Sequence, residues 1–360
     1  MRVLVTGHDG YIGTVLTSLL HDAGHEVLGL DAGLFHACAF SASPRVPARR
    51  ADIRQHDAAL FDDVSAVVHL ANLSNDPLGN LSPGLTAEIN HRATVGFARA
   101  ARAAGVGRFV FASSCSLYGA AGQDAVTETA AFNPQTPYGE AKVLAERDLH
   151  ALASSGFSPV SLRNATVYGA SPRLRFDLVV NNLTAWAVST GEIRMLSDGS
   201  PWRPLVHVRD VAAAAVAAVE APREAVHDQA FNVGREGENY LIRDVAQIVG
   251  QEVPGCRVTF ADGASPDTRS YRVSFAKIAD RLPAWRPTMT VRDGAREVRD
   301  AIGAWTAEHG PLPPAVFEGP RFSRIAHLRS LLDAGALTPE LCWATPPDPF
   351  PAPLADAVGA

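Results

Sequence analysis

Residues 1–13, MRVLVTGHDGYIG, decide the fold, because a short β-branched run leads directly into a glycine-rich turn. The run RVLVTG predicts a buried strand, and the residues from Gly13 onward predict the helix that follows it. Gly7, Gly10 and Gly13 stand at the junction, where glycine permits a tight turn and close approach of backbone N–H groups to a phosphate. A strand, a glycine triplet and a helix in this order favour a nucleotide-binding turn over an ordinary loop.

The same rhythm of strands and helices continues along the first two-thirds of the chain. The strand-like runs HEVLGLD, VSAVVHLAN, GRFVFASS and SPVSLRNA alternate with helical stretches around residues 85–104 and 138–154. This alternation predicts an α/β fold, a doubly wound parallel sheet with helices on its faces. Beyond Gly169, a helical stretch at 178–190 and the short strand IRML predict a smaller lobe over the carboxyl edge of the sheet, where ligands bind.

The two lobes are expected to be interleaved. Residues 1–170 are predicted to form the nucleotide-binding domain, and residues 205–235 to return to it. A smaller α/β substrate-binding lobe then takes residues 171–204 and 236–300.

A further segment follows these lobes. Residues 301–346 predict a C-terminal helical extension, in which FEGPRFSRIAHLRSLLDAG is basic and amphipathic. This extension is expected to pack onto the body or a second subunit, with a partner-binding role as the alternative. Residues 347–360, rich in Pro and Ala, predict a loose tail.

Composition narrows the classes of partner. The 360 residues are 47% hydrophobic and 19% charged, with a net charge of -6, which argues against a nucleic-acid or anionic-membrane surface. No apolar run is long enough to span a bilayer and the start does not read as a secretion leader, so we expect a cytoplasmic protein. Cys38, Cys115, Cys256 and Cys342 are scattered without metal-ligand spacing, so we expect neither a disulfide framework nor a metal site.

Two aspartates indicate which dinucleotide would bind. Asp31 ends the second strand, where a carboxylate accepts hydrogen bonds from ribose hydroxyls and would repel a 2′-phosphate. Ala32 and Gly33 follow it, with no Arg to receive such a phosphate, so NAD is favoured over NADP. Asp52, with Ile53 beside it in ADI, has the spacing to bind the adenine amino group. The alternative is that Asp31 merely starts a turn.

The segments SSCSLYG (residues 113–119) and PYGEAK (residues 137–142) predict proton-transfer chemistry. Tyr138 and Lys142 stand four residues apart and so share one face of a helix, where the Lys ammonium is expected to lower the phenol pKa toward neutrality. A tyrosinate could take a proton from a substrate hydroxyl while a nicotinamide takes the hydride. Tyr-x-x-x-Lys also arises by chance, but the glycine turn and the Ser-rich strand end favour the catalytic interpretation.

The chain carries, in this order, the motifs TGHDGYIG, ADI, HLAN, SSCSLYG, PYGEAK, LRNATVYG and RPLVHVRD. In the order and spacing of these motifs, roughly residues 1–300 resemble the extended short-chain dehydrogenase family. Within it, the chain is similar to nucleotide-sugar epimerases and dehydratases of the UDP-galactose 4-epimerase type. The resemblance implies a Rossmann-type domain, bound NAD, a nucleotide-diphosphate-sugar substrate and a homodimer. It also implies that Ser114 hydrogen-bonds the reacting hydroxyl, Tyr138 is the base and Lys142 is its partner.

The resemblance further implies two sets of contacts. The implied cofactor contacts are Gly7, Gly10, Tyr11, Ile12, Gly13, Asp31, Asp52, Ile53, Leu70, Ala71, Asn72, Tyr138 and Lys142. The implied substrate contacts are Ser116, Thr166, Asn182, Arg203 and Arg269. Asn182 and Arg203 match residues that hold the substrate diphosphate, a role that suits a guanidinium fork. Arg203, beside Trp202, could equally form a surface stacking pair.

Departures from the family pattern narrow the reaction. Related 4,6-dehydratases carry an Asp-Glu pair directly after the residue matching Ser114, where this chain has Cys115 and Ser116, so dehydration is disfavoured. Cys115 is one residue early for the acid/base Cys of other relatives, and we expect it to pack beneath the site. His207 and Asp210 are expected to be structural.

We therefore expect an NAD-retaining nucleotide-sugar epimerase, with C4 as the favoured carbon. The alternatives are a keto-sugar reductase, or another keto-sugar-forming oxidoreductase, on the same scaffold and a non-catalytic NAD-binding regulator.

Overall fold

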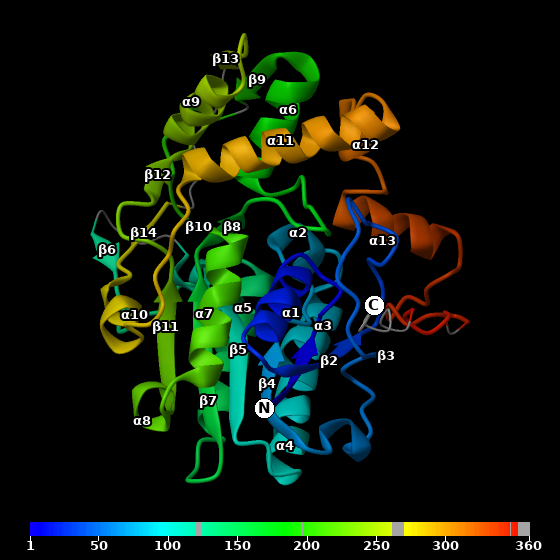
Figure 1. The fold of residues 1–360 in the computed structure, drawn as a ribbon, viewed down its shortest axis with the longest axis vertical. Helices are drawn as coiled ribbons and strands as arrows, with labels where there is room; N and C mark the ends of the chain where they lie inside the picture. Colours follow the sequence, from blue (N-terminus) through cyan, green and yellow to red (C-terminus); the bar gives the residue numbers. More distant parts are fainter. Residues whose placement is uncertain (120–123, 196, 261–269, 346, 352–360) are drawn as a thin grey trace, which may run out of the picture.

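Seven parallel strands form the central sheet of the computed structural model (Figure 1). The structure describes residues 1–119, 124–195, 197–260, 270–345 and 347–351. In spatial order the strands are β11 (Gln229–Val233), β7 (Ser158–Asn164), β5 (Arg108–Ser114), β4 (Val64–His69), β1 (Arg2–Thr6), β2 (Glu26–Asp31) and β3 (Ala48–Arg50). The strand order reverses between β1 and β4, so a ligand crevice is expected at their carboxyl ends. The predicted doubly wound parallel sheet is confirmed.

Helices cover both faces of this sheet because its strands are apolar on both sides. Val3 and Val5 of β1 pack into one buried cluster with α1 (Gly13–Asp22) and α7 (Val208–Glu220), whereas Leu4 packs into another. The second cluster includes residues of α4 (Thr94–Ala103) and α5 (Pro137–His150).

The helical stretch expected at 85–104 consists of three pieces. These are α3 (Pro83–Thr86), the π-helix η2 (Ala87–Ala93) and α4. The buried Asn90 of η2 accepts from the Leu73 backbone N–H at 2.8 Å and donates to the Leu73 carbonyl. This π-helix therefore anchors the segment that follows β4.

The smaller lobe lies above the carboxyl edge of the large sheet (Figure 1). Three short sheets belong to this part of the structure: β12 (Asn239–Leu241) with β10 (Trp202–His207) and β8 (Thr166–Tyr168), β13 (Arg257–Phe260) with β9 (Glu192–Met195), and β14 (Arg272–Val273) with β6 (Ala125–Val126). Its helices α6 (Val179–Thr190), α9 (Ile242–Glu252) and α11 (Val291–His309) pack on one another. The other short helices are η1 (Ala58–Phe61), α2 (Asp76–Gly79), η3 (Cys115–Tyr118), α8 (Arg223–Val226) and α10 (Ala276–Arg281).

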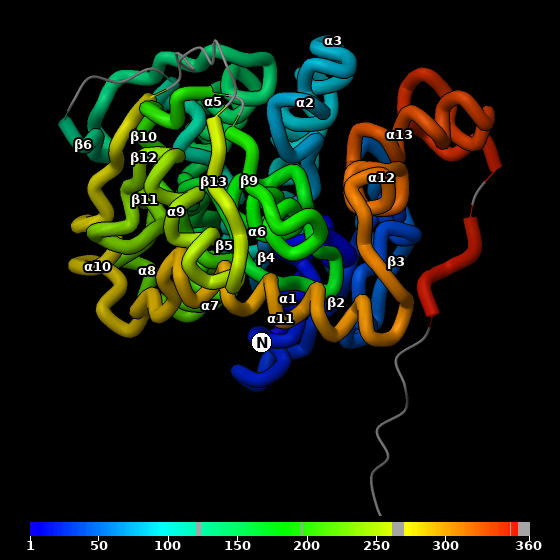
Figure 2. Tube along the Cα trace, turned by 90° about the horizontal axis from the view of Figure 1, so that it is seen from above, coloured from blue at the N-terminus to red at the C-terminus, as the bar shows by residue number. Residues whose placement is uncertain are grey.

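The C-terminal extension packs onto the β3 edge of the large sheet. Its helices α12 (Pro314–Phe317) and α13 (Arg324–Asp333) lie on that side of the molecule in both views (Figures 1 and 2). Leu328 of α13 joins the same buried cluster as Leu4. Part of the stretch expected to be a loose tail is also packed, since Phe350 lies under the Arg50 guanidinium at 4.2 Å and against the His8 ring.

Among the described residues, no helix combines the length and the apolar character that crossing a bilayer requires.

Candidate active site

A first cavity opens at the glycine turn between β1 and α1. Gly7 has a φ of +73°, and a Cβ built on it would lie 2.9 Å from the backbone nitrogen of Ala71. A Cβ on Gly13 would lie 2.1 Å from the carbonyl oxygen of Gly7. The turn therefore requires glycine at these two positions, as the sequence predicts. Its backbone reaches the cavity together with Gly10, Tyr11 and Ile12.

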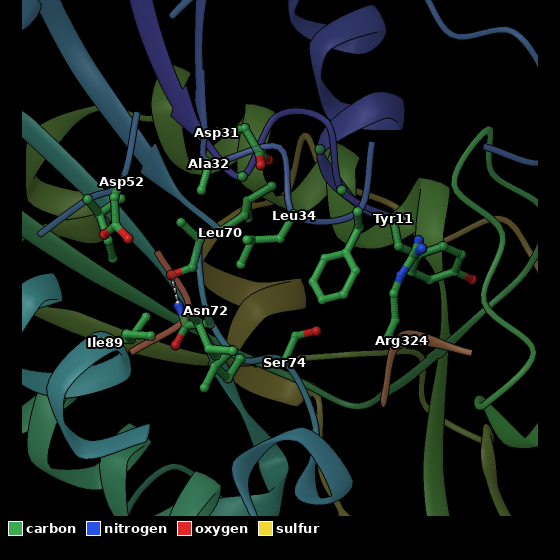
Figure 3. A pocket seen from close by; sticks show the side chains of 18 of the residues that line it. Tyr11, Asp31, Ala32, Leu34, Asp52, Leu70, Asn72, Ser74, Ile89 and Arg324 are labelled. Atoms are coloured by element: carbon green, nitrogen blue, oxygen red, sulfur yellow. Dashed lines mark hydrogen bonds between the residues drawn. The ribbon is translucent and has the colours of Figure 1, made fainter. Parts of the chain in front are cut away.

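The cavity runs past the ends of β2 and β4 (Figure 3). Its other walls include Asp31, Ala32, Asp52, Ile53, Arg54, Leu70, Ala71, Asn72, Ser74, Arg175, Arg324 and Leu341. Eleven of the thirteen residues predicted to contact the cofactor line it, and the two that do not are Tyr138 and Lys142.

Asp31 lies beside the glycine turn. One carboxylate oxygen accepts from the Gly33 N–H at 2.7 Å, and the other accepts from the Asp9 N–H at 3.3 Å. Burial raises the pKa of this carboxyl, and the neighbouring His8 opposes the shift. Asp31 therefore does start a turn, which was the alternative to a binding role. It also lines the cavity, where its carboxylate could accept hydrogen bonds from ribose hydroxyls.

Asp52 lines the cavity with its carboxylate already engaged. Arg54 donates to one oxygen of Asp52 from Nε at 3.0 Å and to the other from Nη2 at 2.6 Å. A carboxylate has further lone pairs, so it could still accept from an adenine amino group.

The third part of the wall is the segment after β4. The Leu70 N–H donates to the Thr6 carbonyl at 3.0 Å, which continues the sheet into the cavity wall. The Asn72 Oδ1 is buried and has no hydrogen-bond partner among the described residues. The glycine turn, the ribose-side carboxylate and this free acceptor together fit an adenine dinucleotide.

Ser114, Tyr138 and Lys142 come together where β5 ends and α5 begins. Tyr138 lies in the first turn of α5, and the Ser114 side chain is near enough to lower the pKa of its phenol. Lys142 is 2% exposed, donates to the Ala112 carbonyl at 2.5 Å and lies 5.6 Å from the centre of the Tyr138 ring. The spacing of four residues does place both side chains on one face of the helix.

The expected lowering of the phenol pKa by Lys142 is not what the structure gives. Burial raises the pKa of Tyr138 to about 12, and the nearby Ser114 side chain opposes that shift. Burial also lowers the pKa of Lys142 to about 7, so near neutrality a large share of this amine is uncharged. Helical spacing predicts proximity, but the loss of water around both groups sets the direction of their pKa shifts.

A second cavity lies beside Ser114, under the smaller lobe. Ser114, Ser116, Thr166 and Arg203 line it, so four residues predicted to meet the substrate share one space. The Ser116 Oγ is buried and has no hydrogen-bond partner in the described part of the chain. Arg203 donates to the Trp202 carbonyl at 2.9 Å and lies 5.7 Å from the centre of the Tyr271 ring.

The two cavities adjoin along two segments. The consecutive residues Ser74 and Asn75 line the first and the second cavity, respectively. Arg175 lines the first and Asp177 the second, and Arg175 donates to Asp177 from Nε at 2.9 Å and from Nη2 at 2.8 Å. A ligand in one cavity can therefore meet a ligand in the other.

One predicted substrate residue among those described is not brought into this space. Asn182 does not line the second cavity, and its side-chain amide donates to the Phe176 carbonyl at 2.8 Å. This bond ties α6 to the loop before it, which is a structural role. Arg269 lies outside the described residues.

Cys115 packs beneath the site, as expected. It is fully buried, its Sγ lies 3.1 Å from the Arg163 carbonyl, and burial raises the pKa of the thiol. Below it, the buried Arg163 donates to Glu146 of α5 from Nε at 2.9 Å, and Glu146 accepts from Ser113 at 2.9 Å. This network ties the ends of β5 and β7 to α5.

His207 and Asp210 are structural, as predicted. His207 is hydrogen-bonded to Glu297 of α11 at 2.7 Å, and Asp210 accepts from the Thr288 and Met289 N–H groups at 3.0 and 3.2 Å.

Sequence reasoning missed five charged residues of the two cavities: Arg54, Asp76, Arg175, Asp177 and Arg324. Asp76 accepts from Thr136, the residue directly before α5, at 2.7 Å. The RLRFD run that contains Arg175 and Asp177 carried the only local signal, a basic–acidic pair two residues apart.

Comparison with known proteins gives a consistent result. The model of the NAD dependent epimerase/dehydratase family matches residues 3–234. The chain is 29% identical to a UDP-glucose 4-epimerase of Bacillus subtilis (79% of this chain, 92% of the relative) and 30% identical to one of Azospirillum brasilense (84% and 91%). A solved structure, MoeE5 in complex with UDP-glucuronic acid and NAD, superposes with a TM-score of 0.73 at 26% identity. It covers 85% of this chain and 99% of its own.

Proposed function

The chain belongs to the NAD-dependent epimerase/dehydratase family, and on that basis we propose that it is a nucleotide-sugar epimerase that inverts C4 of its substrate. One observation carries the proposal. Ser114 lines the second cavity, which adjoins the dinucleotide cavity, and its side chain lowers the pKa of Tyr138, while Lys142 lies on the same helix face, 5.6 Å from the centre of the Tyr138 ring.

The proposed chemistry begins with a proton transfer. Tyr138 takes the proton of the sugar hydroxyl, and Ser114 holds that hydroxyl against the phenol oxygen. NAD, held in the first cavity, would supply the hydride acceptor for that carbon and the hydride donor for the other face of the resulting keto-sugar. Tyr138 then gives its proton back, so the reaction has no net oxidation.

The high pKa of free Tyr138 has a consequence for this scheme. A phenol with a pKa of about 12 is a poor base near neutrality, so positive charge must gather beside it when ligands bind. Lys142 supplies that charge if it is protonated in the complex. The cationic nicotinamide ring of NAD would act in the same direction.

Epimerisation is favoured over dehydration by the residues after Ser114. Elimination of water needs an acid and a base at neighbouring sugar carbons. Here the following residues are Cys115, which is buried beneath the site, and Ser116, which lines the second cavity. Neither side chain offers a carboxyl group.

We assign the substrate to the UDP-sugars first, because the relatives named above act on or bind them. Ser116, Thr166 and Arg203 are the proposed contacts in the second cavity. The homodimer implied by the sequence resemblance is part of the proposal, and light scattering at about twice 38.1 kDa would support it.

The test uses protein purified without added cofactor. It is incubated with a panel of UDP-, dTDP- and GDP-sugars, and both the sugar products and the absorbance of reduced nicotinamide are followed. A new epimer without net absorbance change supports the proposal. Consumption of added NADH with a keto-sugar would indicate a reductase, and no turnover with any sugar would favour the non-catalytic binder.

A further inference from the structure

The C-terminal segment, residues 311–345, forms part of the wall of the dinucleotide cavity. The Trp343 Nε1 donates to the Ala32 carbonyl at 2.8 Å, next to the ribose-side Asp31. Arg54 donates to the Glu340 carbonyl at 2.9 Å, and the adjacent Leu341 lines the cavity. The segment thus reaches the cavity at two places: the loop after β2, and Arg54, which is paired with the Asp52 expected to bind the adenine.

Arg324 is the cation that this segment brings to the cavity. It opens α13, is 3% exposed and lines the cavity, where Figure 3 shows it directed from the C-terminal segment toward Tyr11. Its Nη2 donates to the Arg173 carbonyl at 3.1 Å, and its guanidinium lies 5.0 Å from the centre of the Phe35 ring. Its Nη1 is buried and has no hydrogen-bond partner among the described residues.

Neighbouring arginines are neutralised, whereas Arg324 is not. Arg173 is paired with Asp9, and Arg175 with Asp177. Within the described residues, Arg324 forms no ion pair with a carboxylate, and burial lowers its pKa. A buried guanidinium with an unsatisfied N–H carries a desolvation cost that an anion in the cavity would offset.

We propose that Arg324 binds the diphosphate of the dinucleotide, so that the C-terminal segment completes the cofactor site. The glycine turn offers backbone N–H groups to the same diphosphate, and Tyr11, toward which Arg324 points, belongs to that turn. A guanidinium pairs well with phosphate oxygens because its N–H groups match their geometry. The inference rests on the NAD cofactor of the family and is independent of the sugar reaction.

The test measures binding to cofactor-stripped, full-length protein by calorimetry. The ligands are NAD, ADP-ribose and adenosine, and no sugar is present. R324Q should weaken NAD and ADP-ribose by on the order of 10- to 100-fold and leave adenosine within about twofold. R324K, which keeps the charge, should recover part of the loss. R329Q is the matched control, because Arg329 is an exposed residue of the same helix, and it should bind all three ligands like the wild type.

Two results would overturn the inference: unchanged NAD affinity in R324Q, or an equal loss for adenosine, which would indicate a general distortion of the cavity. If R324Q does not fold, hydrogen exchange on the wild type decides. ADP-ribose, but not adenosine, should then protect the amides of residues 320–335 beyond the ligand-free level, and equal protection by both ligands refutes the role. Because no sugar is added, an absent epimerase activity would leave this result unaffected.

Discussion

Replacing Lys142 by Met should remove a pH-dependent penalty on folding. The chain has two lysines, and Lys142 is the one that lies beside the ring of Tyr138. Burial lowers its pKa from 10.5 to about 7, which means that the folded protein disfavours the ammonium. Between these two values the unfolded chain binds the proton more readily than the folded one, so the free energy of unfolding rises with pH.

The size of this effect follows from the two pKa values. Between pH 7 and pH 9, titration of Lys142 should raise the free energy of unfolding by about 2 kcal/mol. K142M lacks this group and should lack that part of the pH dependence. At pH 7 the variant should be at least as stable as the wild type, because methionine occupies the space without a charge. Its turnover should nevertheless fall by roughly 10²- to 10⁴-fold.

Urea unfolding of cofactor-stripped protein at pH 7, 8 and 9 measures this difference. K277M is the control, since Lys277 also donates to a backbone carbonyl, at 2.8 Å to Ala230, but lies away from the site. K277M should keep the pH-dependent component that Lys142 contributes to the wild type. Equal pH dependence in K142M and the wild type would refute the burial argument, and so would a K142M that is less stable at pH 7.

Other variants separate the remaining parts of the account. Y138F should reduce turnover by at least about 10²-fold and keep its NAD affinity, and calorimetry showing a parallel loss of NAD binding would argue for a structural role instead. D31N should weaken the affinity for NAD on the order of tenfold, because the ribose hydroxyls lose a charged acceptor. If D31N instead bound NADP as tightly as the wild type binds NAD, ribose recognition would not be the sole role of Asp31. E146Q leaves the buried Arg163 without its counter-charge and should destabilise the protein by about 3–5 kcal/mol, and an unchanged urea midpoint would show that the pair is dispensable.

Local sequence patterns were sufficient for the fold and for the centre of the site. The glycine turn is recognisable because steric contacts to Ala71 and to the Gly7 carbonyl forbid side chains there. Ser114 and Tyr138 could be paired from sequence because one ends a parallel strand and the other begins the helix that leads to the next strand.

Features that depend on long-range packing could not be predicted in this way. Arg324 meets Phe35 and Arg173 across more than 100 residues of chain. The direction of the Lys142 and Tyr138 pKa shifts also depends on burial by neighbours that no spacing rule identifies.

The most direct test of the central claim follows the fate of hydrogen at C4. A UDP-sugar labelled with deuterium at C4 is incubated with the enzyme as purified, and the epimer is examined by mass spectrometry and NMR. The account predicts an epimer that keeps deuterium at C4, with no net change in nicotinamide absorbance, because the same hydrogen leaves and returns. Loss of the label to solvent, or product formed only with added NADH, would contradict it.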